Sequence, residues 1–253
     1  MIGQIVSMVL ALAFHLKYNR EITNGLYYLK PSWEVIGKIY TIGLPAIIAQ
    51  ALMSVMTYGL NVILVRIDET VVTAYGLYYK IQQFILFAAF GLRDAITPVI
   101  SFNHGMKSKA RVRAGIKYGM IYTCVIMAAG LLVMEIFAGP FSTVFGLSGE
   151  TQELCVGAMR VISLSFLFAG INIASQGIFQ ALDSGLESLV ISVCRQFLFV
   201  LPVAWGFSQM AIQSMDNIWM VWCTFLIAEG VSTVIACIFM KQVYKKKISV
   251  LEG

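Results

Sequence analysis

The stretch from Met220 to Met240 reads MVWCTFLIAEGVSTVIACIFM and carries a single charged residue, Glu229. As a helix it is long enough to cross the hydrocarbon core of a bilayer, which takes about 20 apolar residues. Comparable apolar runs lie at 39–65, 71–100, 115–138, 154–180 and 189–207, and a shorter run lies at 2–16. The sequence therefore predicts an all-α protein, a polytopic membrane helix bundle of six full transmembrane helices plus one partial N-terminal helix.

The composition supports a membrane protein and excludes other classes. Of the 253 residues, 59% are hydrophobic and 12% are charged, whereas soluble domains average about 45–50% and about 25%. These values argue against a soluble enzyme, a secreted disulfide scaffold and a disordered chain. The five cysteines show no paired spacing, and the chain has no catalytic triad, metal-spaced cluster or nucleotide-binding loop. We therefore expect no enzyme, no metal and no cofactor, so any transport would have to be coupled to an ion.

The basic residues predict an orientation. Only Arg66 and Arg160 fall in the breaks on one side, whereas thirteen of the eighteen Lys and Arg fall in the breaks on the other. These thirteen are Lys17, Arg20, Lys30, Lys38, Lys107, Lys109, Arg111, Arg113, Lys117, Lys241, Lys245, Lys246 and Lys247. Cytoplasmic loops carry such an excess. The pattern predicts a multi-pass protein of a bacterial-type plasma membrane with a cytoplasmic C-terminus, and it accounts for the net charge of +5 without nucleic acid.

The polar breaks also predict the domain organisation. Residues 1–16 are expected to end a preceding transmembrane helix, and residues 17–38 to form a cytoplasmic linker between two membrane units. Residues 39–243 would form the six-helix transmembrane lobe, followed by a cytoplasmic tail at 244–253. The linker has an amphipathic, aromatic character that suits the membrane interface.

Charged residues inside the spans are the first functional candidates, because each costs at least ~2.5–3.5 kcal/mol at the bilayer centre. Glu229 lies midway along its span, so its carboxyl could carry a coupling proton, or it could only hydrogen-bond a neighbouring helix. Lys80 is preceded by Tyr79 and followed closely by Gln83. These residues could line a cavity together, or Lys80 could extend outward to the interface.

Three other charged residues are predicted to act as gates or anchors. Arg93 and Asp94 are neighbours, and adjacent side chains point about 100° apart on a helix, so we expect them to pair with different helices. Arg195 lies near the cytoplasmic end of its span, where headgroups or the carboxyls of Asp183 and Glu187 are within reach along the chain.

Neutral polar residues form two helical stripes. Gln50, Ser54 and Asn61 form one, and the other begins at Asn172 and Gln176. Such a stripe either joins helices or lines an aqueous path, and two stripes in six spans favour a path. The candidate cavity-lining residues are therefore Gln50, Asn61, Tyr79, Lys80, Gln83, Asn172 and Gln176.

Several blocks of the chain resemble the C-terminal lobe of multidrug and toxic compound extrusion (MATE) transporters. They are GLPAIIAQALMSVMTYGLNVILV (43–65), ITPVISFNHGMKSKARVR (96–113), SQGIFQALDSG (175–185) and CRQFLFVLP (194–202). The resemblance implies a twelve-helix antiporter of two six-helix lobes that exchanges H+ or Na+ for amphipathic, often cationic compounds by alternating access. On this reading the chain supplies the second lobe, and its partner is a missing N-terminal six-helix lobe.

The resemblance transfers no ion site. Some family members carry coupling carboxyls in the seventh and tenth helices, but the matching spans 39–65 and 154–180 have no acidic residue at mid-depth. The coupling role considered for Glu229 therefore rests on its position in this sequence and not on the family resemblance. The alternatives are a lipid-linked oligosaccharide flippase of the same superfamily, which would need a more cationic cavity, and a non-transporting membrane scaffold subunit. A scaffold would tolerate apolar replacements of Glu229, Lys80 and Gln83 together.

Overall fold

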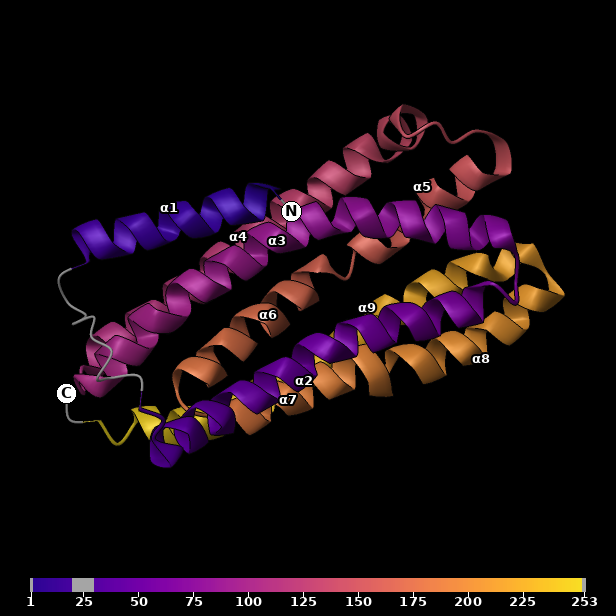
Figure 1. Ribbon diagram of the computed structural model, residues 1–253. Helices are drawn as coiled ribbons and strands as arrows, with labels where there is room; N and C mark the ends of the chain where they lie inside the picture. Colours follow the sequence, from indigo (N-terminus) through magenta and orange to yellow (C-terminus); the bar gives the residue numbers. More distant parts are fainter. Residues whose placement is uncertain (1, 20–29, 252–253) are drawn as a thin grey trace. The chain divides into compact units, whose positions relative to one another are not determined.

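The computed structural model describes residues 2–19 and 30–251, and within them every regular element is helical. The elements are α1 (Ile2–Tyr18), α2 (Trp33–Leu64), α3 (Glu69–Gly105), α4 (Lys109–Val144), α5 (Gly149–Ser163), α6 (Phe166–Ala181), α7 (Gly185–Val193), the π-helical turn η2 (Cys194–Leu198), α8 (Val200–Gln213), the 3-10 turn η3 (Met215–Asn217), α9 (Ile218–Val243) and the π-helical turn η4 (Tyr244–Ile248) (Figure 1).

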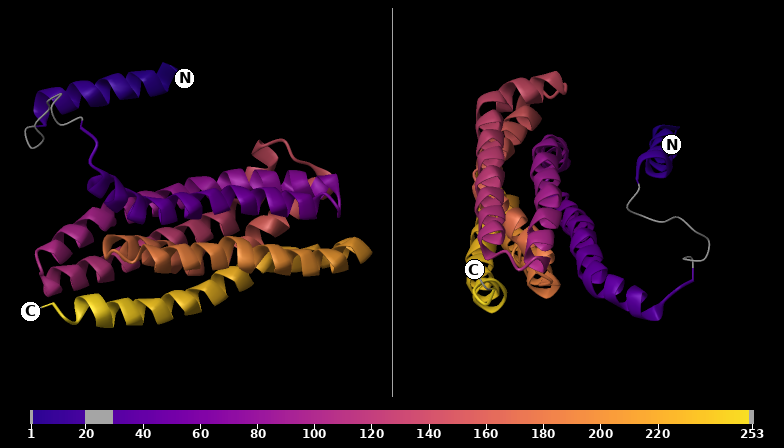
Figure 2. Two further views of the ribbon diagram at one scale, coloured as in Figure 1. Left: turned by 60° about the horizontal axis from the view of Figure 1, so that its bottom comes forward. Right: turned by 90° about the vertical axis from the view of Figure 1, so that its left-hand side faces the viewer.

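The chain divides into two compact units, residues 1–40 and residues 41–253. In the first unit, the rings of Phe14 and Tyr18 stack at 5.6 Å on α1. In the same unit, Lys38 pairs with Glu34 at 2.7 Å on the exposed first turns of α2. The second unit contains the rest of α2 and all later helices, and Figure 2 shows α3 packed along α4 within it. All candidate site residues belong to this second unit.

The second unit contains the six predicted spans. Five helical segments are long and apolar enough to cross a membrane, namely 43–64, 69–105, 109–144, 185–213 and 215–248. The sixth combines α5 and α6, which are bent by 53° where they meet. Ser165 lies at this bend and donates from its hydroxyl to the carbonyl of Ile162 at 2.7 Å. Such local side-chain hydrogen bonds compete with the helical ladder, so one apolar run of the sequence folds as two helices.

Two apolar clusters hold the second unit together. In the larger one, the buried ring of Tyr75 on α3 stacks against Trp222 at 6.2 Å and Phe225 at 6.0 Å, both on α9. The smaller one includes Ile100 of α3, Phe179 of α6 and further residues of α4, α7 and α9. Because α3, α6 and α9 contribute to both clusters, these helices form a rigid frame around the polar residues between them.

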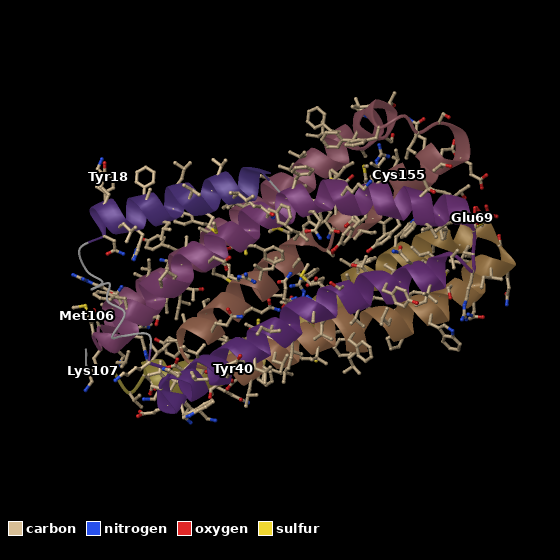
Figure 3. All side chains as sticks on the ribbon, viewed as in Figure 1. Tyr18, Tyr40, Glu69, Met106, Lys107 and Cys155 are labelled. Atoms are coloured by element: carbon tan, nitrogen blue, oxygen red, sulfur yellow. The ribbon has the colours of Figure 1, made fainter. Side chains whose placement is uncertain are left out.

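Some of the basic residues predicted to share one side, Lys107, Lys109 and Lys247, lie at one end of the second unit (Figure 3). Lys17, Lys30 and Lys38 belong to the first unit. Lys109 donates to the carbonyls of Ser249 at 3.0 Å and Leu251 at 3.1 Å, and Lys247 donates to the carbonyl of Asp183 at 2.9 Å. The start of α4, the α6–α7 turn and the C-terminal segment therefore meet. Lys107 lies at this end, and Glu69 lies at the opposite end (Figure 3).

Helix boundaries differ slightly from the predicted domain boundaries. Helix α1 runs to Tyr18, and α2 starts at Trp33 directly after Pro31 and Ser32, a usual start signal, so both ends of the predicted linker are helical. Arg20 and the centre of that linker, 20–29, lie outside the described residues. At the other end, η4 continues the helix to Ile248, into the predicted tail.

Candidate functional site

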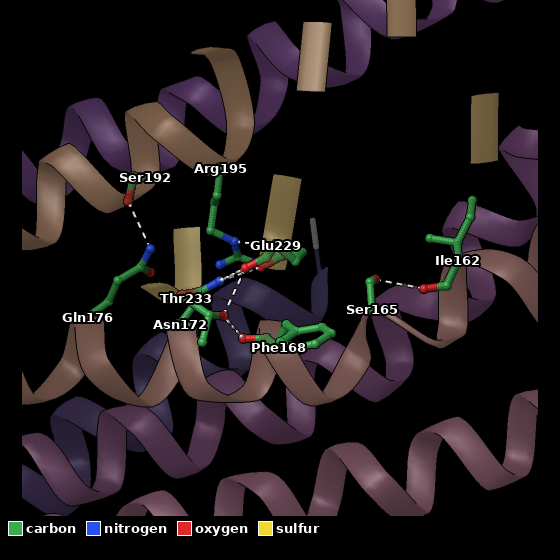
Figure 4. A network of polar contacts seen from close by, with 9 residues as sticks. All are labelled: Ile162, Ser165, Phe168, Asn172, Gln176, Ser192, Arg195, Glu229 and Thr233. Carbon is green, nitrogen blue, oxygen red and sulfur yellow. Dashed lines mark hydrogen bonds and ion pairs between the residues drawn. The ribbon is translucent and has the colours of Figure 1, made fainter. Parts of the chain in front are cut away.

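The centre of the candidate site is the side-chain carboxylate of Glu229 on α9 (Figure 4). One oxygen, Oε1, accepts from Arg195 of η2 at 2.8 Å from Nε and 2.7 Å from Nη2. The other, Oε2, accepts from Nδ2 of Asn172 on α6 at 2.7 Å. The Arg195 and Glu229 side chains are only 8% and 12% exposed. Arg195 and Glu229 therefore form a nearly buried ion pair, and the hydrogen bond from Asn172 links this pair to α6.

The main chain around Glu229 is also tied to α6. The carbonyl of Glu229 accepts from Thr233 Oγ1 at 2.8 Å and from Asn172 Nδ2 at 3.1 Å. The Thr233 hydroxyl also lies 3.3 Å from the carbonyl of Phe168. The carboxylate itself accepts from Arg195 and Asn172, as suits an ionised group that accepts hydrogen bonds and donates none. The charge of Glu229 is thus paired in this structure.

The π-helical turn η2 positions Arg195. The amide of Phe199 donates to the carbonyl of Cys194, five residues earlier, at 3.0 Å. Within this wider turn the consecutive residues Cys194, Arg195 and Gln196 are all buried. Single π turns inside α-helices are frequent at functional sites. Here the turn allows two adjacent polar side chains to enter the bundle together.

The structure corrects the partner predicted for Arg195. Its partner is Glu229, 34 positions later in the chain, rather than a headgroup or the carboxyls of Asp183 and Glu187. The inward direction given by η2 and the packing of α9 against it decide this contact. Neither feature is visible in the local sequence.

The structure also corrects the prediction for Arg93 and Asp94. These neighbours pair with each other, because Arg93 donates to Asp94 Oδ1 from Nε at 2.8 Å and from Nη2 at 2.8 Å. The long arginine side chain bends back to reach a carboxylate that leaves the helix in another direction. The guanidinium of Arg93 also lies 5.0 Å from the centre of the Phe90 ring, a favourable cation–π distance.

Three adjoining cavities lie in this part of the second unit, and two of them are lined by these charged residues. The first, of about 550 Å³, is lined by Gln50, Met53, Ser54, Thr57, Tyr58, Asn61, Tyr79, Gln83, Phe87 and Phe90. The second, of about 140 Å³, is lined by Ala46, Ala49, Gln50, Met53, Phe90, Arg93, Gln176, Gln180, Ser192, Arg195 and Gln196. The third, of about 50 Å³, includes Tyr75, Gln82, Arg195 and Glu229 in its lining. Met53 and Phe90 line all three, so the cavities adjoin one another.

The predicted cavity residues divide among these spaces. Gln50, Asn61, Tyr79 and Gln83 line the first cavity, and Gln176 lines the second. Asn172 is fully buried and contacts Glu229. Lys80, by contrast, is exposed and is not in the lining of the three cavities. It follows Tyr79 directly, so it points about 100° away from the face that carries Tyr79.

Sequence reasoning missed several polar residues of the site. Gln196 is 9% exposed, and its Oε1 has no hydrogen-bond partner in the described part of the chain. Ser192, on the preceding turn, accepts from Gln176 Nε2 at 3.1 Å. Farther away, Glu135 of α4 accepts from the hydroxyl of Ser163 on α5 at 3.0 Å. The sequence signal that could have identified Gln196 and Glu135 was the presence of a polar side chain within an apolar run. Across residues 2–19 and 30–251, no cluster of three His, Cys, Asp or Glu could hold a metal ion.

Comparison with known proteins assigns the family. The MatE family model matches residues 45–205, well over half of the chain. The chain belongs to the MatE family. Among its relatives are the Multidrug export proteins MepA of Staphylococcus saprophyticus (25% identity over 80% of this chain and 44% of the relative) and of Staphylococcus haemolyticus (24% identity over 93% and 51%). The MatE chain thus spans about half the length of the curated relatives it matches.

Solved structures confirm the fold of this MatE chain. A crystal structure of MATE in complex with MaL6 matches 95% of the chain with a TM-score of 0.82 and 19% identity, and 55% of that structure is covered. A MOP superfamily transporter from Pyrococcus furiosus matches 98% of the chain with a TM-score of 0.82 and 20% identity, again over 55% of its own length. Both the predicted all-α membrane bundle and the predicted family are therefore confirmed.

Proposed function

We propose that this chain is one lobe of a secondary active exporter, which exchanges amphipathic small molecules for H+ or Na+ by alternating access. Membership of the MatE family and the multidrug-export relatives support this proposal. The chain covers about half the length of those relatives, so an N-terminal six-helix lobe would supply the rest of the transporter. The cytoplasmic placement of the C-terminus belongs to the same proposal.

The observation that carries the coupling proposal is the position of the buried ion pair beside the cavities. Arg195 and Glu229 both line the third cavity, which shares Met53 and Phe90 with the largest. A proton that reaches Glu229 would neutralise it and release Arg195, because a protonated carboxyl no longer balances the guanidinium. Proton binding would thereby weaken the contacts that join α6, η2 and α9.

A sodium ion is the alternative coupling ion at the same place. Hard cations prefer oxygen ligands. Oδ1 of Asn172 is buried with no partner among the described residues, and it belongs to the amide that already contacts Glu229. Rotation of the Asn172 amide would present its carbonyl-type oxygen to an ion bound at the Glu229 carboxylate. Sodium, like a proton, would compete with Arg195 for the Glu229 charge.

The substitution Glu229→Gln tests the proposal. Cells would produce this chain together with the N-terminal lobe of a MepA relative. Accumulation of a cationic dye, ethidium, and of an anionic dye, 8-anilinonaphthalene-1-sulfonate, would be measured with and without a proton or sodium gradient. We expect the variant to lose gradient-driven efflux, because Gln cannot change its charge. Glu153→Gln, at an exposed carboxyl of α5, is the matched control and should retain efflux.

If the Glu229→Gln variant and its N-terminal lobe together still show undiminished, gradient-dependent efflux, the proposed coupling role of Glu229 is refuted. Gradient dependence separates the two ions, since only one gradient should drive export. A chain that lowers ethidium accumulation without any partner lobe would contradict the proposed two-lobe assembly.

A further inference from the structure

The second cavity, of about 140 Å³, differs in chemistry from the other two. Its lining residues include Arg93 and Arg195, four glutamines and Ser192. No carboxylate is among its lining residues. The charged residues that line this cavity are therefore all basic. The third cavity, by contrast, is lined by both Arg195 and Glu229.

The two guanidinium groups keep donors free for a ligand. An arginine carries five N–H donors in a planar fork. Glu229 engages only Nε and Nη2 of Arg195, and Asp94 engages only Nε and Nη2 of Arg93. The carboxylate of Asp94 is 66% exposed, so solvent screens much of its compensating charge. The cavity consequently retains unused donors, and the charge of Arg93 is balanced only by a largely exposed carboxylate.

A buried amide completes the polar wall. Gln196 is 9% exposed, and its Oε1 lacks a hydrogen-bond partner in the described part of the chain. An unpaired buried polar atom is unfavourable by about 1–3 kcal/mol, so such an amide indicates a site that a ligand completes. The oxygen and nitrogen ends of a glutamine amide can exchange by rotation, which would turn its NH2 donors toward an anion.

The adjoining first and second cavities differ in volume, so they suit ligand groups of different size. Drug-sized ligands occupy pockets of about 300–1,000 Å³, a range that includes the first cavity of about 550 Å³. The second, of about 140 Å³, has the volume of four or five waters at about 30 Å³ each. It suits a carboxylate, sulfonate or phosphate group. Gln50, Met53 and Phe90 line both cavities, so one ligand could extend through both.

We propose that the second cavity binds the anionic group of an amphipathic compound whose apolar body lies in the first cavity. This inference rests on the proposed export function and names its substrate class. The class is an anionic or zwitterionic amphiphile, either a free small molecule or a lipid with an anionic headgroup. It differs from the cationic compounds that the family resemblance implies.

The test compares two probes with the same ring system and opposite charge, 2-naphthoate and 2-naphthylmethylammonium. Their binding to the purified full chain in micelles of a neutral detergent is measured by microscale thermophoresis. We expect 2-naphthoate to bind at least tenfold more tightly, and inorganic phosphate to compete with it. Equal affinity, tighter binding of the ammonium probe, or no binding of either would overturn the inference.

Variants locate the binding in the cavity. Arg93→Gln removes one guanidinium without touching the buried Arg195–Glu229 pair, so it should fold and weaken 2-naphthoate binding about tenfold. Gly177→Ala removes no charge, but its Cβ would lie 2.5 Å from Cγ of Arg93 and displace that side chain, with a similar effect. Arg160→Gln, at an exposed arginine of α5, is the control and should change neither affinity. Unaltered 2-naphthoate binding in both cavity variants would overturn the assignment.

A gain of affinity distinguishes a binding role from a structural one. Glu229→Gln removes the charge that holds Arg195, so we expect 2-naphthoate to bind several-fold more tightly while the ammonium probe is unaffected. Because this variant leaves Arg195 without its carboxylate, binding is measured only after circular dichroism shows native helix content. Oδ1 of Asn172, which has no partner among the described residues, can accept from the new amide. Unchanged or weaker 2-naphthoate binding in a folded Glu229→Gln chain would contradict the proposal.

Nanodiscs separate the two sources of the anion. Loss of 2-naphthoate binding in phosphatidylglycerol nanodiscs, but not in phosphatidylcholine nanodiscs, would identify a lipid headgroup as the occupant. Binding retained in both would identify a free amphiphile. Either result supports an anion site. Because binding is measured without transport, absence of efflux with intact 2-naphthoate binding would count against the export proposal alone.

Discussion

At the residue scale, the Arg195–Glu229 pair gives the largest expected stability effect. Arg195→Met leaves Glu229 buried and unpaired, which should lower the free energy of unfolding by about 3–5 kcal/mol. The double variant Arg195→Met, Glu229→Met should recover most of this loss, because apolar residues of similar volume replace a buried pair well. Chemical denaturation of the purified chain in micelles, followed by circular dichroism, measures both.

The exposed pair of Lys38 and Glu34 is the matched control for this experiment. Lys38→Met should change the free energy of unfolding by less than about 0.5 kcal/mol, because solvent screens such pairs on helix surfaces. A double variant as unstable as Arg195→Met alone would show that Asn172 and its neighbours need the carboxylate itself.

Gly130 provides a packing prediction at the same scale. A Cβ at Gly130 on α4 would lie 2.3 Å from Cγ2 of Ile85 on α3, so Gly130→Ala should destabilise the chain by about 1–3 kcal/mol through overpacking. Gly76→Ala on α3 has open space around the new methyl and should be neutral, or stabilising by up to about 1 kcal/mol, through helix propensity. Thermal unfolding in micelles compares the two. Equal unfolding temperatures of the Gly130→Ala and Gly76→Ala variants would show that α3 and α4 can move apart to accept the added methyl group at little cost.

At the element scale, the π turn η2 determines which residues face the cavity. Buried side chains recur at every fourth position of this span, at Ser188, Ser192, Gln196, Val200, Ala204 and Ser208. An α-helix repeats every 3.6 residues, so a stripe of period four would drift around a regular helix. The wider π turn offsets this drift and keeps both halves of the stripe facing inward.

Deletion of the exposed residue Leu198 tests this role of η2. The shorter span can form a regular α-helix, so we expect the chain to remain folded by circular dichroism. The adjacent side chains of Arg195 and Gln196 should then no longer face the cavity together, and 2-naphthoate affinity should fall about tenfold. Leu198→Ala preserves the length of the turn and should bind normally. Normal binding by the deletion variant would show that the turn is dispensable.

At the scale of the whole molecule, the charge distribution predicts the orientation in the membrane. The basic residues of the α3–α4 turn and the C-terminal segment lie at one end of the second unit, where Lys109 and Lys247 bind main-chain carbonyls. Green fluorescent protein fused to the C-terminus should therefore fluoresce, and alkaline phosphatase inserted in the α4–α5 turn at 146–148 should be active. Exchanging the two reporters is the control, and both should then be silent. An active phosphatase at the C-terminus would reverse the orientation.

The sequence by itself determined the membrane environment, the positions of the apolar spans and the family. These depend on the hydropathy of continuous segments, because a segment in lipid must satisfy its own backbone and so folds as a helix. Helical spacing also placed Gln50, Ser54 and Asn61 on one face, and all three line the first cavity.

Only the tertiary structure decided the pairing of charges and the shape of the site. It paired Arg195 with Glu229, turned Lys80 to the exposed surface and bent the span at Ser165. It also revealed that Oε1 of Gln196 has no hydrogen-bond partner among the described residues. Each of these depends on which helices pack together and on a local departure from regular α-helix. Hydropathy does not encode them, because the free energy of an ion pair depends on distances between segments that are far apart in the chain.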